Sequence, residues 1–290
     1  VSSKNYTLKI LGWEGVGIIS YLLINYWYTS ISNNKSAIKA LVFNKVGDIA
    51  YMYAIICIMY INIDTNTTMY YNSIHDSFYI SILYAIILAS LAKSAQILLH
   101  CWLGDAMAGP TPVSALLHAA TMVTAGIYLL IKISPILHIV GDTWIEELII
   151  IIGLMTILLG GISSLYQYDI KKIIAYSTCA QIGYMYYAIS YMTPSHSSLY
   201  HLFTHGFFKA LLFLSAGLLI HNLLLEQDIR KYGSLLYSFP LFYLSFFIGT
   251  LAIIGTPMLA GYYSKDIIIL QAYSYKSIGI IIILIIIIIL

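Results

Sequence analysis

Charged residues are scarce in this sequence. Only 9% of its 290 residues are Asp, Glu, Lys or Arg, whereas 60% are hydrophobic and the mean hydropathy is +0.87. A soluble domain carries about 25% charged residues, so this chain has too little polar surface to cover a soluble globule. The composition excludes a soluble enzyme or a soluble binding domain. We therefore expect an all-α polytopic membrane protein.

Cysteine is scarce as well. Cys57, Cys101 and Cys179 lie in apolar runs and share no CxxC spacing, so we interpret them as packing residues and expect no disulfide, zinc site or iron–sulfur cluster. The net charge is only +2, and the sequence has neither a basic run nor a GxGxxG loop. A nucleic-acid or nucleotide partner is therefore not expected, and no redox cofactor is expected on this chain.

Apolar runs recur along the whole chain. A helix needs about 20 apolar residues to cross a hydrocarbon core about 30 Å thick, and nine such crossings fit this sequence. The expected spans are 12–31, 41–62, 78–103, 113–134, 144–166, 170–192, 196–225, 238–271 and 273–290. Gly104–Pro112 and the motif GTPMLAG combine glycine with proline, which breaks transmembrane helices, so two broken helices are expected.

Basic residues separate between two faces when the nine crossings alternate. The expected faces hold Lys35, Lys39, Lys45, Lys171, Lys172, Arg230 and Lys231 on one side and Lys4, Lys9, Lys132 and Lys276 on the other. The positive-inside tendency predicts that the first face is the matrix or cytoplasm. The nearly pure isoleucine of the last span and the 27 tyrosines fit AT-rich coding, so we expect a multi-pass protein of the mitochondrial inner membrane.

Three lysines, Lys93, Lys209 and Lys265, lie inside apolar runs. A lone ammonium group at membrane depth is unfavourable unless the fold supplies water or a counter-ion. Lys93 lies near the middle of its span, where its side chain is too short to reach the membrane surface. Each of the three lysines therefore indicates a proton or ion pathway.

Carboxylates accompany the first of these lysines. Glu14 follows Trp13 at the start of a span, and we expect it to pair with a buried lysine, with helix capping at the interface as the alternative. Burial lowers the pKa of a lysine and a nearby carboxylate raises it, so a switchable Glu14 would load and unload a proton on Lys93. Asp48 is expected to pair with Lys45 near a helix start, with a supporting role in proton transfer left open.

Histidines continue the polar pattern. His118 lies in PTPVSALLHAATMVTAG, and a histidine can pass a proton between its two ring nitrogens, although hydrogen-bonded packing is the alternative. His201, His205 and Lys209 recur at intervals of four, so they share one helix face, which should line a wet interior.

Lys265 and Asp266 are adjacent and follow GTPMLAG. Neighbouring residues point in different directions from a helix, so the two cannot form a simple facing pair. Charged residues beside a helix break are typical of transporters. The alternative is a helix end at the membrane interface, capped by Ser264, Lys265 and Asp266.

Longer motifs surround these residues in a fixed order. The blocks are LGWEGVGIISYLLINYWY, NKVGDIA, LAKSAQILLHCWLGDAMAGPTPVSALLHAATMVTAGIYLL, YQYDIKKIIAYSTCAQIGYM, HLFTHGFFKALLFLSAGLLIHN, EQDIRKYG and GTPMLAGYYSKDIII. In order and spacing they resemble NADH dehydrogenase subunit 5, the distal antiporter-like subunit of mitochondrial respiratory complex I. The resemblance covers nearly the whole chain, except residues 1–9, the segment 63–76 and the isoleucine tail.

This resemblance implies two inverted five-helix repeats, each with a broken helix, around a central axis of protonatable residues. Residues 1–140 would form the first half, which lacks its first helix, and residues 141–290 the second half. In the first half Glu14 and Lys93 would form the charged pair. The residues that the resemblance assigns to the axis are Glu14, Lys93, His118, His201, His205, Lys209, Lys265 and Asp266.

Members of this family have further helices on both sides of the part seen here. We expect a central fragment, completed by separately encoded chains that supply N- and C-terminal helices, with a longer chain represented only in part as the alternative. The other expected partners are membrane lipids and the membrane-arm subunits of complex I, especially the neighbouring antiporter-like subunit. NADH, FMN, iron–sulfur clusters and ubiquinone are expected in other subunits.

The sequence thus predicts a proton-translocating subunit of NADH:ubiquinone oxidoreductase that carries out no redox chemistry itself. One alternative is a component of a multisubunit cation/proton antiporter, which shares the ionisable motifs. The other is a structural membrane module whose charges only hold helices together. The EQDIRKYG block and the AT-rich bias favour the first function, and three lysines at membrane depth argue against a purely structural module.

Overall fold

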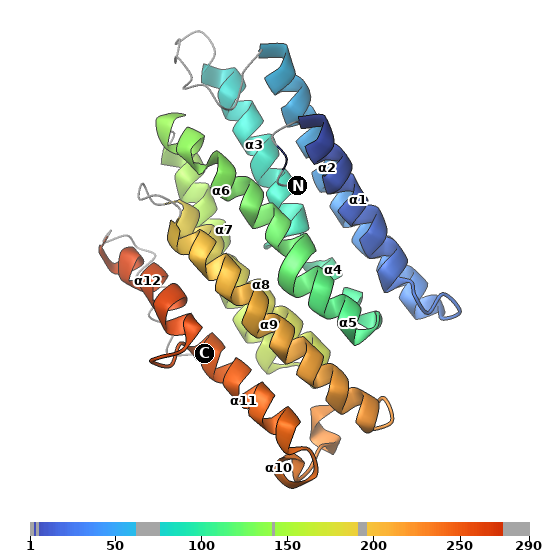
Figure 1. The fold of residues 1–290 in the computed structure, drawn as a ribbon. Coiled ribbons are helices and arrows are strands. Elements are labelled where there is room, and N and C mark those ends of the chain that lie inside the picture. Colours follow the sequence, from blue (N-terminus) through green and yellow to red (C-terminus); the bar gives the residue numbers. More distant parts are fainter. Residues whose placement is uncertain (1–2, 4–5, 62–75, 141–142, 191–195, 275–290) are drawn as a thin grey trace.

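The structure is a computed structural model that describes residues 3, 6–61, 76–140, 143–190 and 196–274. Within these residues the regular structure is helical, apart from one backbone bridge between Asp169 and Asp228. Figure 1 shows the long helices side by side, with α1 and α2 at one edge and α11 and α12 at the other. The α-helices are α1 (Tyr6–Ile24), α2 (Ile31–Ile61), α3 (Asp76–Lys93), α4 (Cys101–Asp105), α5 (Thr111–Ser114), α6 (Met122–Val140), α7 (Thr143–Leu165), α8 (Ile170–Ile189), α9 (His196–Asn222), α10 (Leu235–Ser238), α11 (Pro240–Ile254) and α12 (Ala260–Ser274).

The helices confirm the expected all-α membrane architecture. Among the described residues, four helical stretches are long and apolar enough to cross a bilayer. They are Ile31–Met59, Thr111–Leu137, Trp144–Leu165 and His196–Asn222, and the shorter apolar helices are Tyr79–Lys93 and Pro240–Ile254. The number of nine crossings stays a prediction, because nearly all of the span expected at 273–290 lies outside the described residues.

Helix boundaries agree best in the middle of the chain. Helices α7, α8 and α9 end within about three residues of the expected spans. Helix α2 differs, because it begins at Ile31 rather than at residue 41, so Lys35 and Lys39 lie on its first turns. Only the apolar part of a helix is visible as a hydrophobic run, and polar turns that extend beyond it are missed.

Basic residues expected on the first face do lie at one end of the bundle. A cavity of about 510 Å³ at the start of α2 and α8 is lined by Lys35, Lys39, Lys171 and Lys172. Lys39 forms an ion pair with Asp105 at 2.6 Å. Lys171 is buried and donates a hydrogen bond to the carbonyl of Gly109 at 3.1 Å.

Two similar loops fix the position of α8 and α9 at this end. Asp169 and Asp228 form the backbone bridge, and the amide of Ile229 donates to the carbonyl of Tyr168 at 3.0 Å. The guanidinium of Arg230 lies 3.9 Å from the centre of the Tyr168 ring. Hydrogen bonds from Arg230 lower the pKa of the exposed Asp228 carboxyl group. The YQYDIKK and EQDIRKYG blocks therefore hold the start of α8 close to the end of α9.

The first helix break follows Lys93 directly. Helix α3 ends at that residue, and the chain is not α-helical again until α4. Ala95 and Leu98 have positive φ angles of 51° and 77°, which are unusual for residues with a side chain. The break expected at Gly104–Pro112 therefore starts about ten residues earlier, and that stretch forms a second irregular segment after α4. Side chains of Trp102 and Cys179 donate hydrogen bonds to the backbone carbonyls of Ala92 and Ala95 and stabilise this first break. The break therefore needs no glycine or proline in its sequence.

A π-helical segment joins α5 to α6. It covers Ala115–Thr121 and contains His118. The sequence predicted a continuous α-helix here, because a shift of the helical register by one residue is not visible in a run that is apolar on nearly all sides. Such turns are rare and occur frequently at functional sites.

The second break confirms the prediction from GTPMLAG. Helix α11 ends at Ile254, Gly255 has a φ of 92° and Met258 a φ of 73°, and α12 begins at Ala260. Pro257 lies in the middle of this turn and cannot donate a backbone hydrogen bond.

Gly261 allows α12 to pack back against α11. A Cβ atom on Gly261 would lie 1.7 Å from the carbonyl oxygen of Ala252. We expect Gly261→Ala to separate the two halves of the broken helix, which costs roughly 1–3 kcal/mol or more, and to lower the amount of assembled complex on native gels. Gly206→Ala is the matched control, because a Cβ atom there meets nothing within 4 Å. Equal assembly of the two variants would contradict this account of the packing.

Candidate functional site

Lys93 lies at the buried end of an ion-pair network. Its side chain is only 1% exposed, and Nζ lies 3.2 Å from Oδ1 of Asp48. The ammonium group also donates a hydrogen bond to the carbonyl of Trp13 at 3.2 Å and lies 5.4 Å from the centre of its ring. Gly17 leaves room for it, since a Cβ atom there would be 3.0 Å from Nζ. The fold therefore supplies the counter-ion that the sequence required for a lysine at this depth.

Glu14 reaches this network through another lysine. Its carboxylate lies 3.5 Å from Nζ of Lys45, and the same ammonium group lies 3.9 Å from Asp48. The charges thus alternate in the order Glu14, Lys45, Asp48 and Lys93. The expected direct pair between Glu14 and Lys93 is wrong, because Asp48 occupies the position next to the lysine.

Asp48 is the site residue that sequence reasoning underestimated. Its expected contact with Lys45 is present, but its side chain is 4% exposed and also pairs with Lys93. The sequence contained a signal for this role, because Asp48 lies inside the apolar span 41–62. The depth criterion that singled out the lysines applies to a carboxylate as well.

Trp13 belongs to the same cluster. It is 2% exposed and packs against Tyr51 with a ring-centre distance of 4.9 Å. Trp13 is therefore a core residue, whereas Trp144 is 75% exposed.

His118 lies between the network and the second half of the chain. It is fully buried in the π-helical segment, and neither ring nitrogen has a hydrogen-bond partner among the described residues. Its ring centre is 5.8 Å from that of Trp102, whose Nε1 donates to the carbonyl of Ala92 at 3.2 Å. Trp102 therefore connects His118 to the backbone beside Lys93.

Helix α9 carries the expected polar stripe. His201, His205 and Lys209 are all fully buried, and the His205 ring lies against the backbone of Ala119, the residue after His118. The ring centres of His201 and His205 are 6.2 Å apart. The predicted arrangement on one interior face is confirmed.

Helix α8 supplies polar partners to this stripe. Gln181 Oε1 lies 3.0 Å from Nε2 of His201, and Ser264 Oγ lies 2.9 Å from Nδ1 of the same ring. Lys209 donates a hydrogen bond to Oγ of Ser177 at 2.7 Å. His201 and Lys209 are thus satisfied by neutral side chains, in contrast to Lys93 with its carboxylate partner.

Lys265 lines a polar cavity next to these partners. The cavity has a volume of about 310 Å³, and Ser177, Gln181 and Tyr184 also line it. The ammonium group of Lys265 lies 5.3 Å from the centre of the Tyr184 ring. A space of this size with Ser177, Gln181 and Lys265 on its walls has room and polar partners for water. Lys265 therefore faces a cavity that also reaches the partners of Lys209 and His201.

Asp266 points elsewhere, as expected from its adjacent position. A Cβ atom on Gly255 would lie 3.1 Å from Oδ1 of Asp266, so the carboxylate lies against the second helix break. Lys265 and Asp266 consequently do not form a facing pair.

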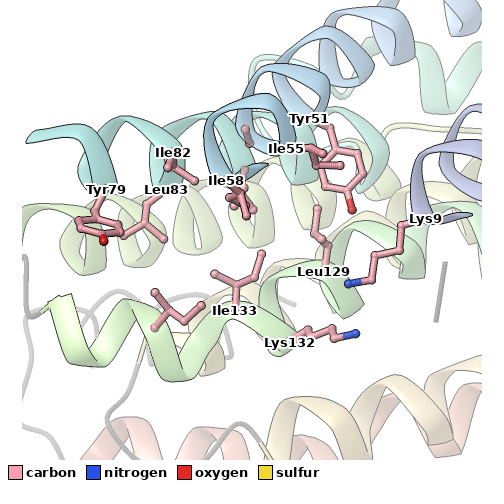
Figure 2. A pocket seen from close by; sticks show the side chains of 13 residues that line it. Lys9, Tyr51, Ile55, Ile58, Tyr79, Ile82, Leu83, Leu129, Lys132 and Ile133 are labelled. Atoms are coloured by element: carbon pink, nitrogen blue, oxygen red, sulfur yellow. The ribbon is translucent and has the colours of Figure 1, made fainter. Parts of the chain in front are cut away.

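A different pocket lies between α1, α2, α3 and α6. It has a volume of about 80 Å³, and Figure 2 shows isoleucine, leucine and tyrosine side chains around it, with Lys9 and Lys132 at one end. Lys9 is buried. None of the eight expected axis residues lines this pocket, so its apolar walls separate it from the polar cluster.

Metal ligands do not gather in the described part of the chain. No group of three or more His, Cys, Asp or Glu residues is placed there to hold a metal ion. Cys57 and Cys179 are buried, in keeping with a packing role, whereas Cys101 is exposed.

Comparison with known sequences agrees with the motif blocks. The profile described as "NADH:quinone oxidoreductase/Mrp antiporter, TM" matches residues 3–290. NADH-ubiquinone oxidoreductase chain 5 of Acanthamoeba castellanii is 47% identical over 293 residues, which cover 96% of this chain and 43% of the relative. The protein of the same name from Metridium senile is 47% identical over 288 residues, covering 94% and 46%. The chain therefore spans less than half the length of these relatives.

Solved structures share the fold. A chain of the Mrp complex from Dietzia sp. DQ12-45-1b is 28% identical with a TM-score of 0.81, covering 91% of this chain and 29% of that one. A chain of the membrane-bound sulfane sulfur reductase, an archaeal respiratory membrane complex, is 23% identical with a TM-score of 0.86, covering 96% and 58%. With nearly its whole length matched by the family profile, the chain belongs to the NADH:quinone oxidoreductase/Mrp antiporter transmembrane family.

Proposed function

We propose that this chain is the proton-translocating part of a membrane-arm subunit of NADH:ubiquinone oxidoreductase. The observation that carries the proposal is a series of ionisable groups from α1 to α12, which begins at the half-exposed Glu14, continues through buried groups such as Asp48, Lys93 and Lys209, and ends at the partly buried Lys265. A static protein core gains little from buried lysines, because each must be compensated by a partner or by water. A proton path requires such groups.

The first step takes place in the network of Glu14, Lys45, Asp48 and Lys93. While Asp48 is paired with Lys93, the carboxylate favours the charged ammonium form of that lysine. If Asp48 turns towards Lys45, Lys93 loses its counter-ion in a dry environment and releases its proton. The shared position of Asp48 between two ammonium groups makes it a switch, with Glu14 as the second partner of Lys45.

Transfer along the membrane plane passes through the histidines. His118 has buried ring nitrogens with no hydrogen-bond partner in the described chain, so it is able to bind a proton or a water molecule. His205 lies against the backbone next to His118, and His201 follows on α9. A water molecule between successive rings would complete the contact, because ring centres 6.2 Å apart are too distant for a direct hydrogen bond.

The second half ends at the polar cavity. Lys209 is hydrogen-bonded to Ser177, and His201 is hydrogen-bonded to Gln181. Ser177 and Gln181 both line the cavity of Lys265. Water in this space would carry a proton between Lys209 and Lys265, while Asp266 stays at the helix break. Lys265 is therefore the terminal group of the proposed path.

The wider setting of the chain follows from the same proposal. Residues 1–140 and 141–290 form two antiporter-like halves, and each half has a helix break beside a lysine, Lys93 and Lys265. The partners are other membrane-arm subunits, membrane lipids and the polypeptide segments that complete the missing helices. The location is the mitochondrial inner membrane, and NADH, FMN, iron–sulfur clusters and ubiquinone are bound by other subunits.

Reconstitution of the intact complex tests the function. In liposomes that contain ubiquinone, NADH oxidation should drive protons into the lumen, and an uncoupler should abolish the signal. NADH oxidation without proton movement would contradict the proposal. Proton movement driven by a sodium gradient without NADH would instead identify a cation/proton antiporter, the alternative favoured by the 28% identity to a chain of an Mrp complex.

A further inference from the structure

Helix α8 has two opposite polar faces. Ser177, Gln181 and Tyr184 follow at intervals of four and three, so they share the face that contacts Lys209, His201 and Lys265. Cys179 and Tyr186 are seven residues apart and lie about 180° away around the helix axis. This second face contacts the break after Lys93.

Tyr186 bonds to the last turn of α3. Its hydroxyl group is hydrogen-bonded to Oγ of Ser90 and also to the side chain of Ser94. Ser90 Oγ donates to the carbonyl of Ile87 at 2.6 Å, and Ser94 Oγ donates to the carbonyl of Ser90 at 2.6 Å. The Tyr186 hydroxyl has a single hydrogen, so it can donate to only one of the two serines at a time. The three hydroxyl groups are fully buried, where the loss of a partner is costly.

Cys179 makes a second contact with the break. Its thiol donates to the carbonyl of Ala95 at 3.3 Å, and Ala95 is one of the residues with a positive φ. Together the two contacts hold Ser90, which precedes Lys93 in the sequence, and Ser94 and Ala95, which follow it. They fix the backbone that carries this lysine to a helix whose other face holds the second half of the polar path.

We propose that Tyr186 is a positioning residue that holds the helix break after Lys93 against α8. A change in the conformation or protonation of Lys209 or Lys265 is then transmitted through α8 to the backbone that carries Lys93. The hydroxyl group touches neither the proton nor the lysine, and it acts by holding Ser90 and Ser94. The structural part of this inference is independent of the function, whereas its effect on pumping rests on the proposed function.

Hydrogen exchange tests directly whether Tyr186 holds the break. In the assembled complex, Tyr186→Phe should increase amide exchange in the segment 94–100 by about two- to tenfold, as expected for the loss of one ordinary hydrogen bond. Ser90→Ala should give the same increase, and the double variant should add little. Tyr187→Phe is the matched control, since this tyrosine is equally buried on α8 but packs against Leu154 and Ile268. Unchanged exchange in Tyr186→Phe, or an equal increase in Tyr187→Phe, would overturn the inference.

Proton pumping provides the second measurement. We expect Tyr186→Phe to lower the protons moved per NADH about two- to tenfold. Combined with Lys209→Met, it should show an effect smaller than the product of the two single effects, because both variants act on the same helix. Multiplicative effects would refute the coupling through α8. Failure of the wild-type complex to pump would refute the proposed function instead, and the exchange experiment would still decide whether Tyr186 holds the break.

Discussion

Lys93→Met should abolish proton translocation through this chain, with a fall of about 100-fold or more, the usual range for loss of a positioned proton-transfer group. The substitution keeps most of the apolar stem but removes the only part that can bind a proton. It also leaves the buried Asp48 with only the longer 3.9 Å contact to Lys45, which costs up to about 3–5 kcal/mol, so less complex should assemble. Translocation is measured as NADH-driven proton uptake into vesicles, normalised to NADH oxidation.

A double variant separates proton transfer from stability. Lys93→Met with Asp48→Asn removes both buried charges, so assembly should recover while pumping stays absent. Glu14→Gln should have a smaller effect than Asp48→Asn, because Glu14 reaches Lys93 only through Lys45 and Asp48. Lys35→Met is the matched control, since that lysine is exposed on the same helix as Asp48. Normal pumping by the well-assembled double variant would sink the relay role of Lys93.

Lys265→Arg should assemble normally yet lose most proton translocation, again by about 100-fold. Arginine keeps the positive charge and the contact with the Tyr184 ring, but its guanidinium group does not release a proton in proteins. If Lys265 only packs against the ring, Lys265→Arg should be silent. The same assay of proton uptake per NADH distinguishes these outcomes.

Lys231→Arg serves as the control for this substitution. Lys231 is 61% exposed and pairs with Glu226 in the loop after α9, where exchange of one cation for another should change pumping little. A loss in both variants would indicate a general effect of arginine on assembly and would count against Lys265 as the terminal relay group.

Much of the fold could be predicted from apolar length alone. Helices α7, α8 and α9 appear within a few residues of their expected spans, because Asp169 and Pro194 interrupt the apolar runs of the sequence sharply. The break after α11 was predictable as well, since Gly255 and Pro257 each disfavour a continuing helix. The break after Lys93 was not, because tertiary contacts to Ala92 and Ala95 replace the missing helical hydrogen bonds there.

The candidate site was also predictable from the sequence only in part. Lys93, Lys209 and the stripe on α9 were found from membrane depth and periodicity, which depend only on local sequence. Which carboxylate pairs with Lys93 was not predicted correctly, because Glu14 and Asp48 both lie on helices that pack near α3. Which of two similar groups reaches a lysine depends on the azimuth of each helix, and a single sequence does not encode that directly.

The π-helical segment at Ala115–Thr121 makes the orientation of α6 depend on the number of residues that precede it. Such a turn holds one residue more than an α-helical turn, so everything after it is rotated by about 100° relative to a regular helix. His118 faces inward only in this register. Removing a single residue between His118 and Thr121 would restore a regular helix and turn α6 on its axis, so that the side chains it offers to α3 and α8 would be exchanged for others.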